Sequence, residues 1–263
     1  MDRDESPSRV LVTGAGSPSG IGWATVASLA RQGHRVVAND FEEGPLVELR
    51  DTLRAEGCRH DVEVLVADVA EAERFEERVR ELTAVEGLTG LVANAGIANR
   101  RTLGELGRDA WLRVMDVNFG GVLHAVRGAE SALRASGGAV VAVSSIMGPR
   151  WGWSGHGHYA ASKGAIEGLV RSLAIELGGD GVRVNAVAPG FINTAQSAAP
   201  DQAGSAERLA QIEPFVPLGR VGRADDVARV IEFLLGEGAR YVTGQAIVVD
   251  GGLTLGNMRP AFV

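Results

Sequence analysis

Short apolar runs rich in Val, Leu, Ile and Ala alternate along this chain with longer segments whose apolar residues recur at helical spacing. The runs predict seven strands, at residues 9–13, 35–40, 62–67, 90–94, 139–144, 182–187 and 246–250. The segments between them predict helices at residues 21–32, 45–55, 70–85, 108–135, 158–177 and 224–235. Nearly continuous apolar strands are typical of a sheet buried on both faces, and strands that alternate with helices join through right-handed crossovers into a parallel sheet. The sequence therefore predicts an α/β fold in which residues 1–263 form a single domain, a doubly wound seven-stranded parallel sheet flanked by helices.

The composition narrows the class of protein and of partner. The chain carries a net charge of −7, so neither nucleic acid nor an anionic membrane is an expected partner. Its single cysteine, Cys58, cannot form an internal disulfide and fits a reducing compartment. The polar first residues are not typical of a signal peptide, and no apolar run reaches the roughly 18 residues of a spanning helix. We therefore expect a cytoplasmic protein that acts on a small molecule.

A glycine-rich turn, Thr13-Gly-Ala-Gly-Ser-Pro-Ser-Gly-Ile-Gly22, joins the first predicted strand to the first helix. Glycines let the backbone approach a pyrophosphate closely, and the helix N-terminus favours its negative charge. This context predicts a Rossmann-type dinucleotide site, and a tight turn without a ligand is the alternative. The residues expected to contact the dinucleotide here are Gly14, Ser19, Gly20, Ile21 and Gly22.

Asp40 ends the second predicted strand and is followed by Phe41. A carboxylate at this position can accept hydrogen bonds from the adenosine ribose and repels a 2′-phosphate. No arginine lies in the glycine-rich turn to attract that phosphate, so NAD(H) is the expected cofactor rather than NADP(H). The alternative for Asp40 is a cap on the next turn.

The ends of the third and fourth predicted strands carry further candidate cofactor contacts. Asp68 and Val69 follow the third strand, where Asp68 either meets the adenine or caps the next helix. Asn94, Ala95 and Gly96 follow the fourth strand, and such small residues let a cofactor approach the backbone.

Lys163 is the only lysine among 26 basic residues, and it lies four positions after Tyr159, one of two tyrosines. Residues four apart share one face of a helix, so we expect the ammonium beside the phenol. A neighbouring positive charge stabilises phenolate and is expected to lower the pKa of Tyr159, which would let it exchange protons near neutral pH. A chance pair on a solvated helix is the alternative.

In chain order, these motifs resemble the classical short-chain dehydrogenase/reductase family over essentially the whole length. The matching residues are the glycine-rich turn, Asp68-Val69, Asn94-Ala-Gly96, Asn118, Ser144-Ser145, Tyr159-Ala-Ala-Ser-Lys163, Pro189-Gly190 and Val249-Asp-Gly-Gly252. The family pattern Ser-x-x-Gly selects Ser145 over Ser144 as the active-site serine. The resemblance also implies a homotetramer.

The resemblance implies a catalytic set of Asn118, Ser145, Tyr159 and Lys163. Tyr159 would be the general acid and base, Ser145 would polarise the substrate oxygen, and Lys163 would also hold the nicotinamide ribose. Asn118 would hold a water that relays protons from Lys163, with a buried amide that satisfies backbone groups as the alternative. The nicotinamide would meet Pro189, Gly190, Ile192 and Thr194, together with Tyr159 and Lys163.

Aromatic and apolar residues near the catalytic set are candidate walls of the substrate site. Met147, Trp151, Trp153 and Phe191 are expected to line it with Ser145 and Tyr159, although packing of the loop on the core is an alternative. Residues 193–216 form the least regular stretch and are expected to be a substrate-binding loop or lid rather than an ordinary surface loop. His156 and His158 lack a third ligand at suitable spacing, so no metal site is expected.

Two features depart from the usual family pattern. The glycine-rich turn is two residues longer than usual, as in the enoyl-thioester reductase branch, but those enzymes usually have six residues between Tyr and Lys, where this chain has three. The interval from Ser145 to Tyr159 is one residue longer than usual. The expected function is that of an NAD(H)-dependent oxidoreductase interconverting a secondary alcohol and a ketone. The alternatives are a 3-oxoacyl-thioester reductase and a non-catalytic dinucleotide-binding sensor or scaffold.

Overall fold

All seven expected strands pair in parallel within one sheet of the computed structural model, which describes residues 8–194 and 206–256. They are β1 (Arg9–Thr13), β2 (Arg35–Asp40), β3 (Glu63–Val66), β4 (Gly90–Ala93), β5 (Ala139–Val143), β6 (Arg183–Pro189) and β9 (Ala246–Val249). The strand order is β3-β2-β1-β4-β5-β6-β9. It reverses between β1 and β4, and ligands of doubly wound sheets bind outside the carboxyl ends of the strands at such a point. The predicted α/β fold is confirmed.

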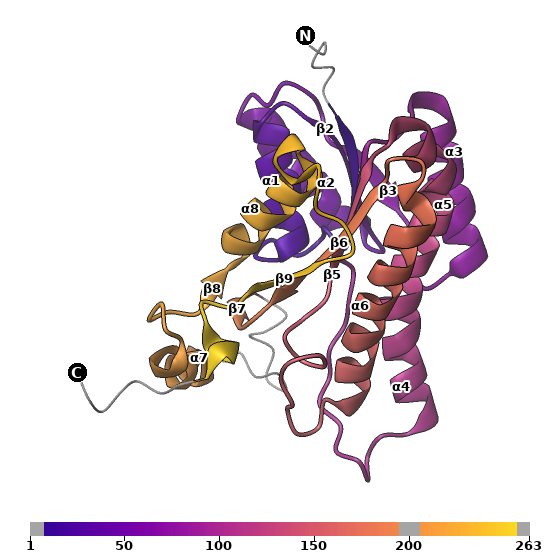
Figure 1. Ribbon diagram of the computed structural model, residues 1–263. Helices are drawn as coiled ribbons and strands as arrows, with labels where there is room; N and C mark the ends of the chain where they lie inside the picture. Colours follow the sequence, from indigo (N-terminus) through magenta and orange to yellow (C-terminus); the bar gives the residue numbers. More distant parts are fainter. Residues whose placement is uncertain (1–7, 195–205, 257–263) are drawn as a thin grey trace.

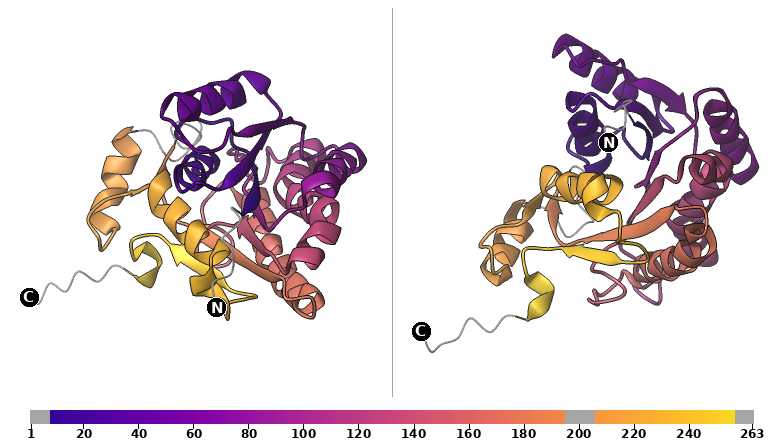
Figure 2. Two further views of the ribbon diagram at one scale, coloured as in Figure 1. Left: turned by 90° about the horizontal axis from the view of Figure 1, so that it is seen from above. Right: turned by 45° about the horizontal axis from the view of Figure 1, so that its top comes forward.

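A layer of helices covers each face of the sheet (Figures 1 and 2). On one face lie α1 (Ile21–Arg31), α2 (Glu43–Ala55) and α8 (Ala224–Leu235), and on the other α3 (Ala72–Glu86), α4 (Arg108–Met115), α5 (Gly121–Ser136) and α6 (Gly157–Gly178). Successive residues of a strand point to opposite faces. Leu11 of β1 accordingly packs in the cluster that contains Phe75, whereas Val12 packs in the cluster that contains Leu46. Both faces are therefore apolar, as the continuous runs predicted.

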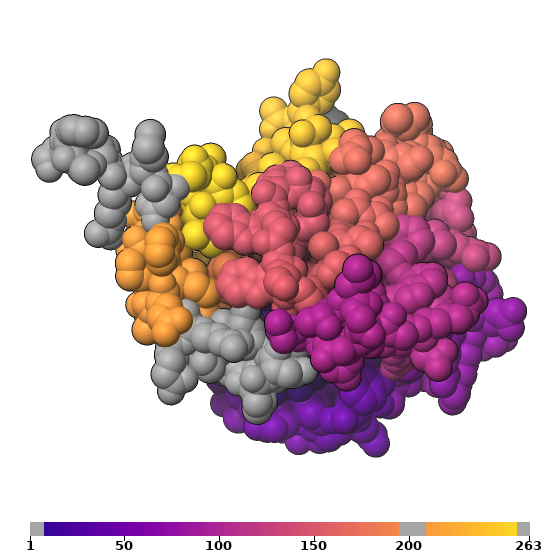
Figure 3. Space-filling model, turned by 90° about the horizontal axis from the view of Figure 1, so that it is seen from below, coloured from indigo at the N-terminus to yellow at the C-terminus, as the bar shows by residue number. Residues whose placement is uncertain are grey.

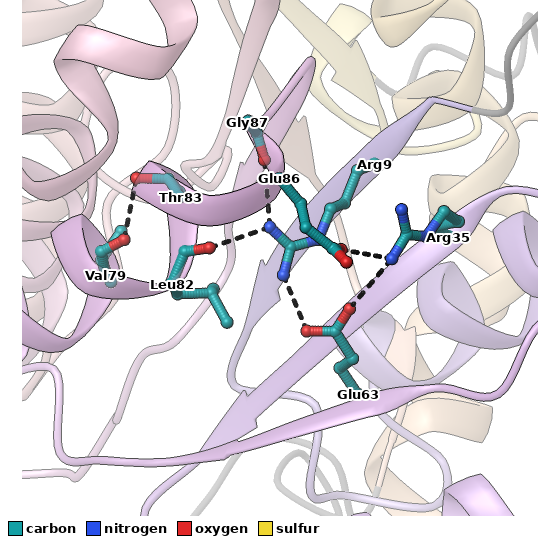
Figure 4. A network of polar contacts seen from close by, with 8 residues as sticks. All are labelled: Arg9, Arg35, Glu63, Val79, Leu82, Thr83, Glu86 and Gly87. Atoms are coloured by element: carbon teal, nitrogen blue, oxygen red, sulfur yellow. Dashed lines mark hydrogen bonds and ion pairs between the residues drawn. The ribbon is translucent and has the colours of Figure 1, made fainter.

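The amino ends of the strands are tied to the end of α3 by a network centred on Arg9 (Figure 4). Arg9 is buried, and its guanidinium donates to the carbonyl oxygens of Leu82 and Gly87, each at 3.0 Å, and to Glu63 at 2.7 Å. Arg35 pairs with both Glu63 and Glu86. The planar fork of an arginine can reach several acceptors at once, which a lysine cannot reproduce. This network fixes the end of the sheet opposite the carboxyl ends.

The long helix expected at residues 108–135 is interrupted. Between α4 and α5 the chain forms a π-helical turn at Asp116–Gly120, with Asn118 at its centre. A π-helical turn inserts one extra residue, and such turns are frequent at functional sites. The apolar periodicity does not reveal this insertion, so the two helices were expected as one.

Several other boundaries and elements differ from expectation. Most helix and strand ends move by one or two residues, as for α3, expected at 70–85 and found at Ala72–Glu86. Within the expected substrate-binding loop 193–216, the structure forms α7 (Ala206–Ile212) and a 3-10 turn at Glu213–Phe215, while residues 195–205 lie outside the described residues. A small separate sheet pairs β7 (Ile192–Asn193) with β8 (Gly222–Arg223). Among the described helices, none is both long enough and apolar enough to cross a membrane.

Candidate active site

A cavity of about 460 Å³ lies at the carboxyl ends of the strands, where the strand order reverses. Figure 3 looks onto this end of the molecule. The expected site residues that line the cavity are Gly14, Gly20, Ile21, Asp40, Phe41, Asp68, Val69, Asn94, Ala95, Gly96, Ser145, Met147, Tyr159, Lys163, Pro189, Gly190, Phe191, Ile192 and Thr194. Five expected residues do not line it, namely Ser19, Gly22, Asn118, Trp151 and Trp153.

The glycine-rich turn is held against the end of β4. The amide Nδ2 of Asn94 donates to the carbonyl oxygens of Thr13 and Gly14, each at 2.9 Å. Gly14 has a φ of +67°, which favours glycine, and a Cβ on Gly22 would lie 2.3 Å from the Gly14 oxygen. Gly22 therefore allows α1 to pack against the turn, although it does not face the cavity.

The N-terminus of α1 opens into the same cavity. Its N-cap is Gly20, which has no side chain to cap the helix, and the first turn carries no acidic residue. Unpaired N–H groups and the helix dipole together favour an anion. This end of the cavity therefore fits the diphosphate of a dinucleotide.

The carboxylate of Asp40 faces the glycine-rich turn. Its Oδ2 accepts a hydrogen bond from the backbone N–H of Gly16 at 2.7 Å, and its Oδ1 accepts one from Phe41 at 2.8 Å. Asp40 thus braces the glycine-rich turn, rather than only the turn that follows it, and also presents its charge to the cavity. Among the described lining residues, the arginine and lysine side chains are those of Arg113 and Lys163.

Asp68 closes a turn ahead of α3 rather than capping the helix itself. Its Oδ1 accepts from the N–H of Ala70 at 2.9 Å, and the N-cap of α3 is Glu71. Its Oδ2 pairs with Arg113 of α4 at 3.1 Å. Arg113 lines the cavity and was not among the expected site residues.

Lys163 lies beneath Tyr159 at the end of β5. Its ammonium Nζ donates to the carbonyl oxygen of Val143 at 2.8 Å and is 5.7 Å from the centre of the Tyr159 ring. Only 4% of Lys163 is exposed, and this burial lowers the pKa of its ammonium to about 8. A Cβ on Gly96 would come within 3.3 Å of Nζ, so the space around the ammonium is narrow.

The pKa of Tyr159 moves opposite to the direction expected from the sequence. Burial raises it, and a hydrogen bond with the side chain of Ser145 opposes that rise. The lowering expected from the ammonium is not found, because the removal of the phenolate from water is the largest cause of the shift. The hydroxyl of Ser145 also accepts a hydrogen bond from the N–H of Met147 at 3.1 Å.

Asn118 is fully buried in the π-helical turn, with its amide satisfied by protein groups. Its Oδ1 accepts from the N–H of Ile97 at 2.8 Å, and its Nδ2 donates to the oxygen of Ile97 and to the hydroxyl of Ser162, each at 3.0 Å. This arrangement matches the alternative of a buried amide that satisfies backbone groups. It joins the segment after β4 to α6, and the proton-relay role stays a prediction.

The segment after β5 is fastened to α6 by Ser144 and its neighbours. The hydroxyl of Ser144 donates to the carbonyl oxygen of Lys163 at 3.0 Å and to Glu167 at 3.3 Å. Glu167 is buried and pairs with Arg150 at 2.6 Å. Gly148 has a φ of +112°, and a Cβ there would lie 2.4 Å from the oxygen of Ala160. Ser144 is thus held by the helix, whereas Ser145 faces the tyrosine.

The aromatic residues expected around the substrate divide into two groups. Phe191 lines the cavity, and Trp153 packs edge-on against it with ring centres 5.3 Å apart. Trp151 does not line the cavity, and it packs, like Phe191, against an apolar cluster that contains Ile146 and Val216. Trp153 and Trp151 therefore support the wall from behind.

The lining also includes residues that were not among the expected site residues. They are Ser17, Asn39, Ala67, Ile97, Ala98, Arg113, Val117, Val143, Ser144 and His156. One signal could have found His156, since it precedes Tyr159 by three residues and such residues share a helix face. Among the described residues, no three or more His, Cys, Asp or Glu side chains are grouped so that they could hold a metal ion.

Comparisons with known proteins agree with this geometry. A family described as enoyl-(acyl carrier protein) reductase matches residues 14–254. The 3-oxoacyl-(acyl-carrier-protein) reductase FabG of Thermotoga maritima is 37% identical over 93% of this chain and 97% of its own length. The cis-4-hydroxycyclohexanecarboxylate dehydrogenase of Sinomonas cyclohexanicum is 38% identical over 93% and 95%. A crystal structure of a gluconate 5-dehydrogenase from Burkholderia cenocepacia, in complex with NADP and tartrate, is 30% identical with a TM-score of 0.87 and covers 95% of this chain and 96% of that one.

Proposed function

Because this chain belongs to the short-chain dehydrogenase/reductase family of oxidoreductases that act on alcohols and ketones, we propose that it interconverts a secondary alcohol and a ketone with NAD(H). One observation carries the proposal. Ser145, Tyr159 and Lys163 face a cavity that is continuous with the glycine-rich turn. A dinucleotide bound along that turn would extend to the three side chains.

The residues present fit a dinucleotide. The diphosphate would lie on the N-terminus of α1, where Gly20 and Ile21 line the cavity. The nicotinamide would lie between Lys163 and the segment that follows β6, which contributes Ile192 and Thr194 to the lining. When bound, the nicotinamide supplies or accepts the hydride.

The protein itself contributes proton transfer and the orientation of the substrate. In reduction, the phenol of Tyr159 donates its proton to the carbonyl oxygen of the substrate, and in oxidation it removes the hydroxyl proton. The hydroxyl of Ser145, which is hydrogen-bonded to Tyr159, orients and polarises the same substrate oxygen. Lys163 would hold the ribose hydroxyls and stabilise phenolate as it forms.

Asp40 supports NAD(H) over NADP(H). Its Oδ2 accepts from Gly16 of the glycine-rich turn, beside which the adenosine ribose would lie, and its Oδ1 accepts from Phe41. A 2′-phosphate would meet this carboxylate, and the described cavity lining offers no arginine or lysine beside it, since Arg113 is paired with Asp68.

A 3-oxoacyl-thioester reductase is the second candidate, favoured by the similarity to the Thermotoga maritima enzyme. A non-catalytic sensor is a third, which the intact Ser145, Tyr159 and Lys163 disfavour. An acyl-thioester reductase would consume reduced nicotinamide with a 3-oxoacyl thioester and would ignore simple secondary alcohols.

The test is the absorbance of reduced nicotinamide with a panel of secondary alcohols, ketones and a 3-oxoacyl thioester. Tyr159→Phe should lower kcat by about a hundredfold or more while NAD binding persists. Tyr241→Phe is the matched control, because Tyr241 is the only other tyrosine and is fully exposed. Equal activity of the two variants would remove the acid–base assignment, and absence of any turnover by the unmodified protein would favour the sensor.

We propose further that the protein acts as a homotetramer in the cytoplasm. Ile175 of α6 and Phe233 of α8 leave apolar surface uncovered on the single chain, which a second copy would bury. Sedimentation analysis would measure the assembled mass, and a monomer at micromolar concentration would contradict the proposal.

A further inference from the structure

His156 is a buried residue of the cavity wall. Only 2% of the residue is exposed, yet it is part of the cavity lining. It is the N-cap of α6, and its carbonyl oxygen accepts the N–H of Ala160 at 2.8 Å. It lies three residues before Tyr159, at the start of the same helix, and both residues line the cavity. The imidazole therefore borders the space in which the substrate of Tyr159 must lie.

The backbone around His156 is fixed from two directions. Gly155 has a φ of +80°, and its carbonyl oxygen accepts the N–H of Arg101 at 2.8 Å. The Nε2 of His158 donates to the Oδ1 of Asn99 at 2.6 Å. Burial is the largest cause that lowers the pKa of His158, which favours its neutral ring. The segment after β4 and the start of α6 thus hold His156 in place.

The hydrogen bond at one ring nitrogen of His156 defines the chemistry of the other. Its Nδ1 lies 3.2 Å from the carbonyl oxygen of Ser154, and a carbonyl oxygen can only accept. Nδ1 therefore carries the proton, and in the neutral ring Nε2 is left as an acceptor. Within residues 8–194 and 206–256, Nε2 has no hydrogen-bond partner, and His156 lines the cavity.

We propose that the Nε2 of His156 accepts a hydrogen bond from a second hydroxyl of the substrate, next to the carbon that reacts at Tyr159. This inference rests on the proposed function and names its substrate class as vicinal diols and polyols, together with the corresponding hydroxyketones. Met147 and Phe191 give the neighbouring wall an apolar character, so a carbon skeleton can lie against it. The carbonyl of an acyl thioester can only accept, so the neutral ring would not recognise it.

Two substitutions of His156 distinguish the roles of its two ring nitrogens. In His156→Asn the amide lies near the position of Nδ1 and can keep the bond to Ser154, but nothing replaces Nε2. In His156→Gln the longer side chain places an amide near the position of Nε2. The substrates are two matched pairs, butan-2-ol and its vicinal diol, and cyclohexanol and its vicinal diol. The assay is run at pH 8.

The unmodified protein should prefer the diol of at least one pair, by about tenfold in kcat/KM, as expected for one hydrogen bond at a buried site. His156→Asn should abolish that preference, with a loss of kcat/KM that is about tenfold larger for the diol than for the mono-alcohol, while His156→Gln should retain part of the preference. Thermal unfolding with and without NAD checks that each variant is folded and binds the cofactor.

Three results would overturn the inference while leaving the proposed function intact. They are an unmodified protein that does not prefer the diol in either pair, a His156→Asn variant with an unchanged preference, and an equal loss for both members of a pair. An equal loss would indicate a merely structural role for the ring. If the unmodified protein turns over no alcohol or ketone, the proposed function fails, and this inference fails with it.

Discussion

The ammonium of Lys163 lies 5.7 Å from the ring centre of Tyr159 and is anchored by the carbonyl oxygen of Val143 at 2.8 Å. The two side chains come from successive turns of α6, and the anchor comes from the end of β5. Both groups are withdrawn from water, and burial favours the neutral form of each: it raises the pKa of Tyr159 and lowers the pKa of Lys163. The site thus holds a protonated phenol at neutral pH, ready to donate to a carbonyl oxygen.

Lys163→Arg should lower kcat/KM by about a hundredfold or more, although it conserves the charge. A planar guanidinium needs more space than an ammonium, and even a Cβ on Gly96 would come within 3.3 Å of Nζ. Steady-state kinetics with the best alcohol of the panel would measure the loss. Arg171→Lys, at an exposed position on the same helix, is the control for an Arg–Lys exchange in general. Near-normal rates in Lys163→Arg would show that a generic positive charge suffices.

The buried ammonium also predicts how stability depends on pH. The pKa of Lys163 is about 8 in the folded protein and 10.5 in the reference state. Below pH 8 the folded protein carries the full cost of a buried charge, and between these two values the unfolded chain binds more protons, so the free energy of unfolding rises with pH. The rise should be on the order of 1–3 kcal/mol.

The measurement is urea unfolding at pH 7 and at pH 10 of the unmodified protein and of Lys163→Met. The variant lacks the titrating group, so its free energy of unfolding should rise less between these two values. Tyr159, whose pKa is raised from 10.0, keeps its proton in the folded protein while the unfolded chain begins to lose it near pH 10, so it opposes the rise slightly. Because Tyr159 is present in both proteins, its contribution cancels in the comparison. If the free energy of unfolding rose equally in the two proteins, the Lys163 ammonium would not be the cause of the pH dependence.

The strands and the edge of the sheet that carries the site could be predicted from the sequence because a parallel sheet buried on both faces requires apolar runs. Val10, Leu11 and Val12 are all buried, and this is the pattern that the run at residues 9–13 indicated. Helix starts were less certain: Glu43 begins α2 two residues before the expected Pro45, which is tolerated in a first turn.

The finer features of the site depend on three-dimensional packing that periodicity does not encode. The π-helical turn around Asn118 adds one residue to a helix whose apolar spacing looks continuous. The pKa of Tyr159 depends on the balance between burial and charge, which only the surrounding structure decides. His156 lay next to a recognised motif, but its place in the wall depends on the path of a glycine-rich loop.

Asp40→Asn should narrow the preference for NAD over NADP by about tenfold or more in the ratio of the two kcat/KM values. The amide oxygen can still accept a hydrogen bond from Gly16, so the brace is partly kept while the charge is removed. Asp51→Asn, at an exposed position on α2, is the control. An unchanged ratio in Asp40→Asn would show that another group selects the cofactor.

A pair of glycines tests the close approach of α1 to the glycine-rich turn. Both Gly22 and Gly44 lie in the first turn of a helix, but a Cβ on Gly22 would lie 2.3 Å from the oxygen of Gly14, whereas a Cβ on Gly44 would meet nothing within 4 Å. Gly22→Ala must displace backbone and should destabilise the fold by about 1–3 kcal/mol.

Gly44→Ala should be neutral or stabilising by up to about 1 kcal/mol, because alanine favours the helix. Urea unfolding measures the stability of both variants, and titration calorimetry with NAD measures whether the displaced turn also weakens binding. We expect weaker binding in Gly22→Ala alone, because the turn that moves is the one that would hold the diphosphate. Equal stability and equal NAD affinity in the two variants would contradict the role assigned to this contact.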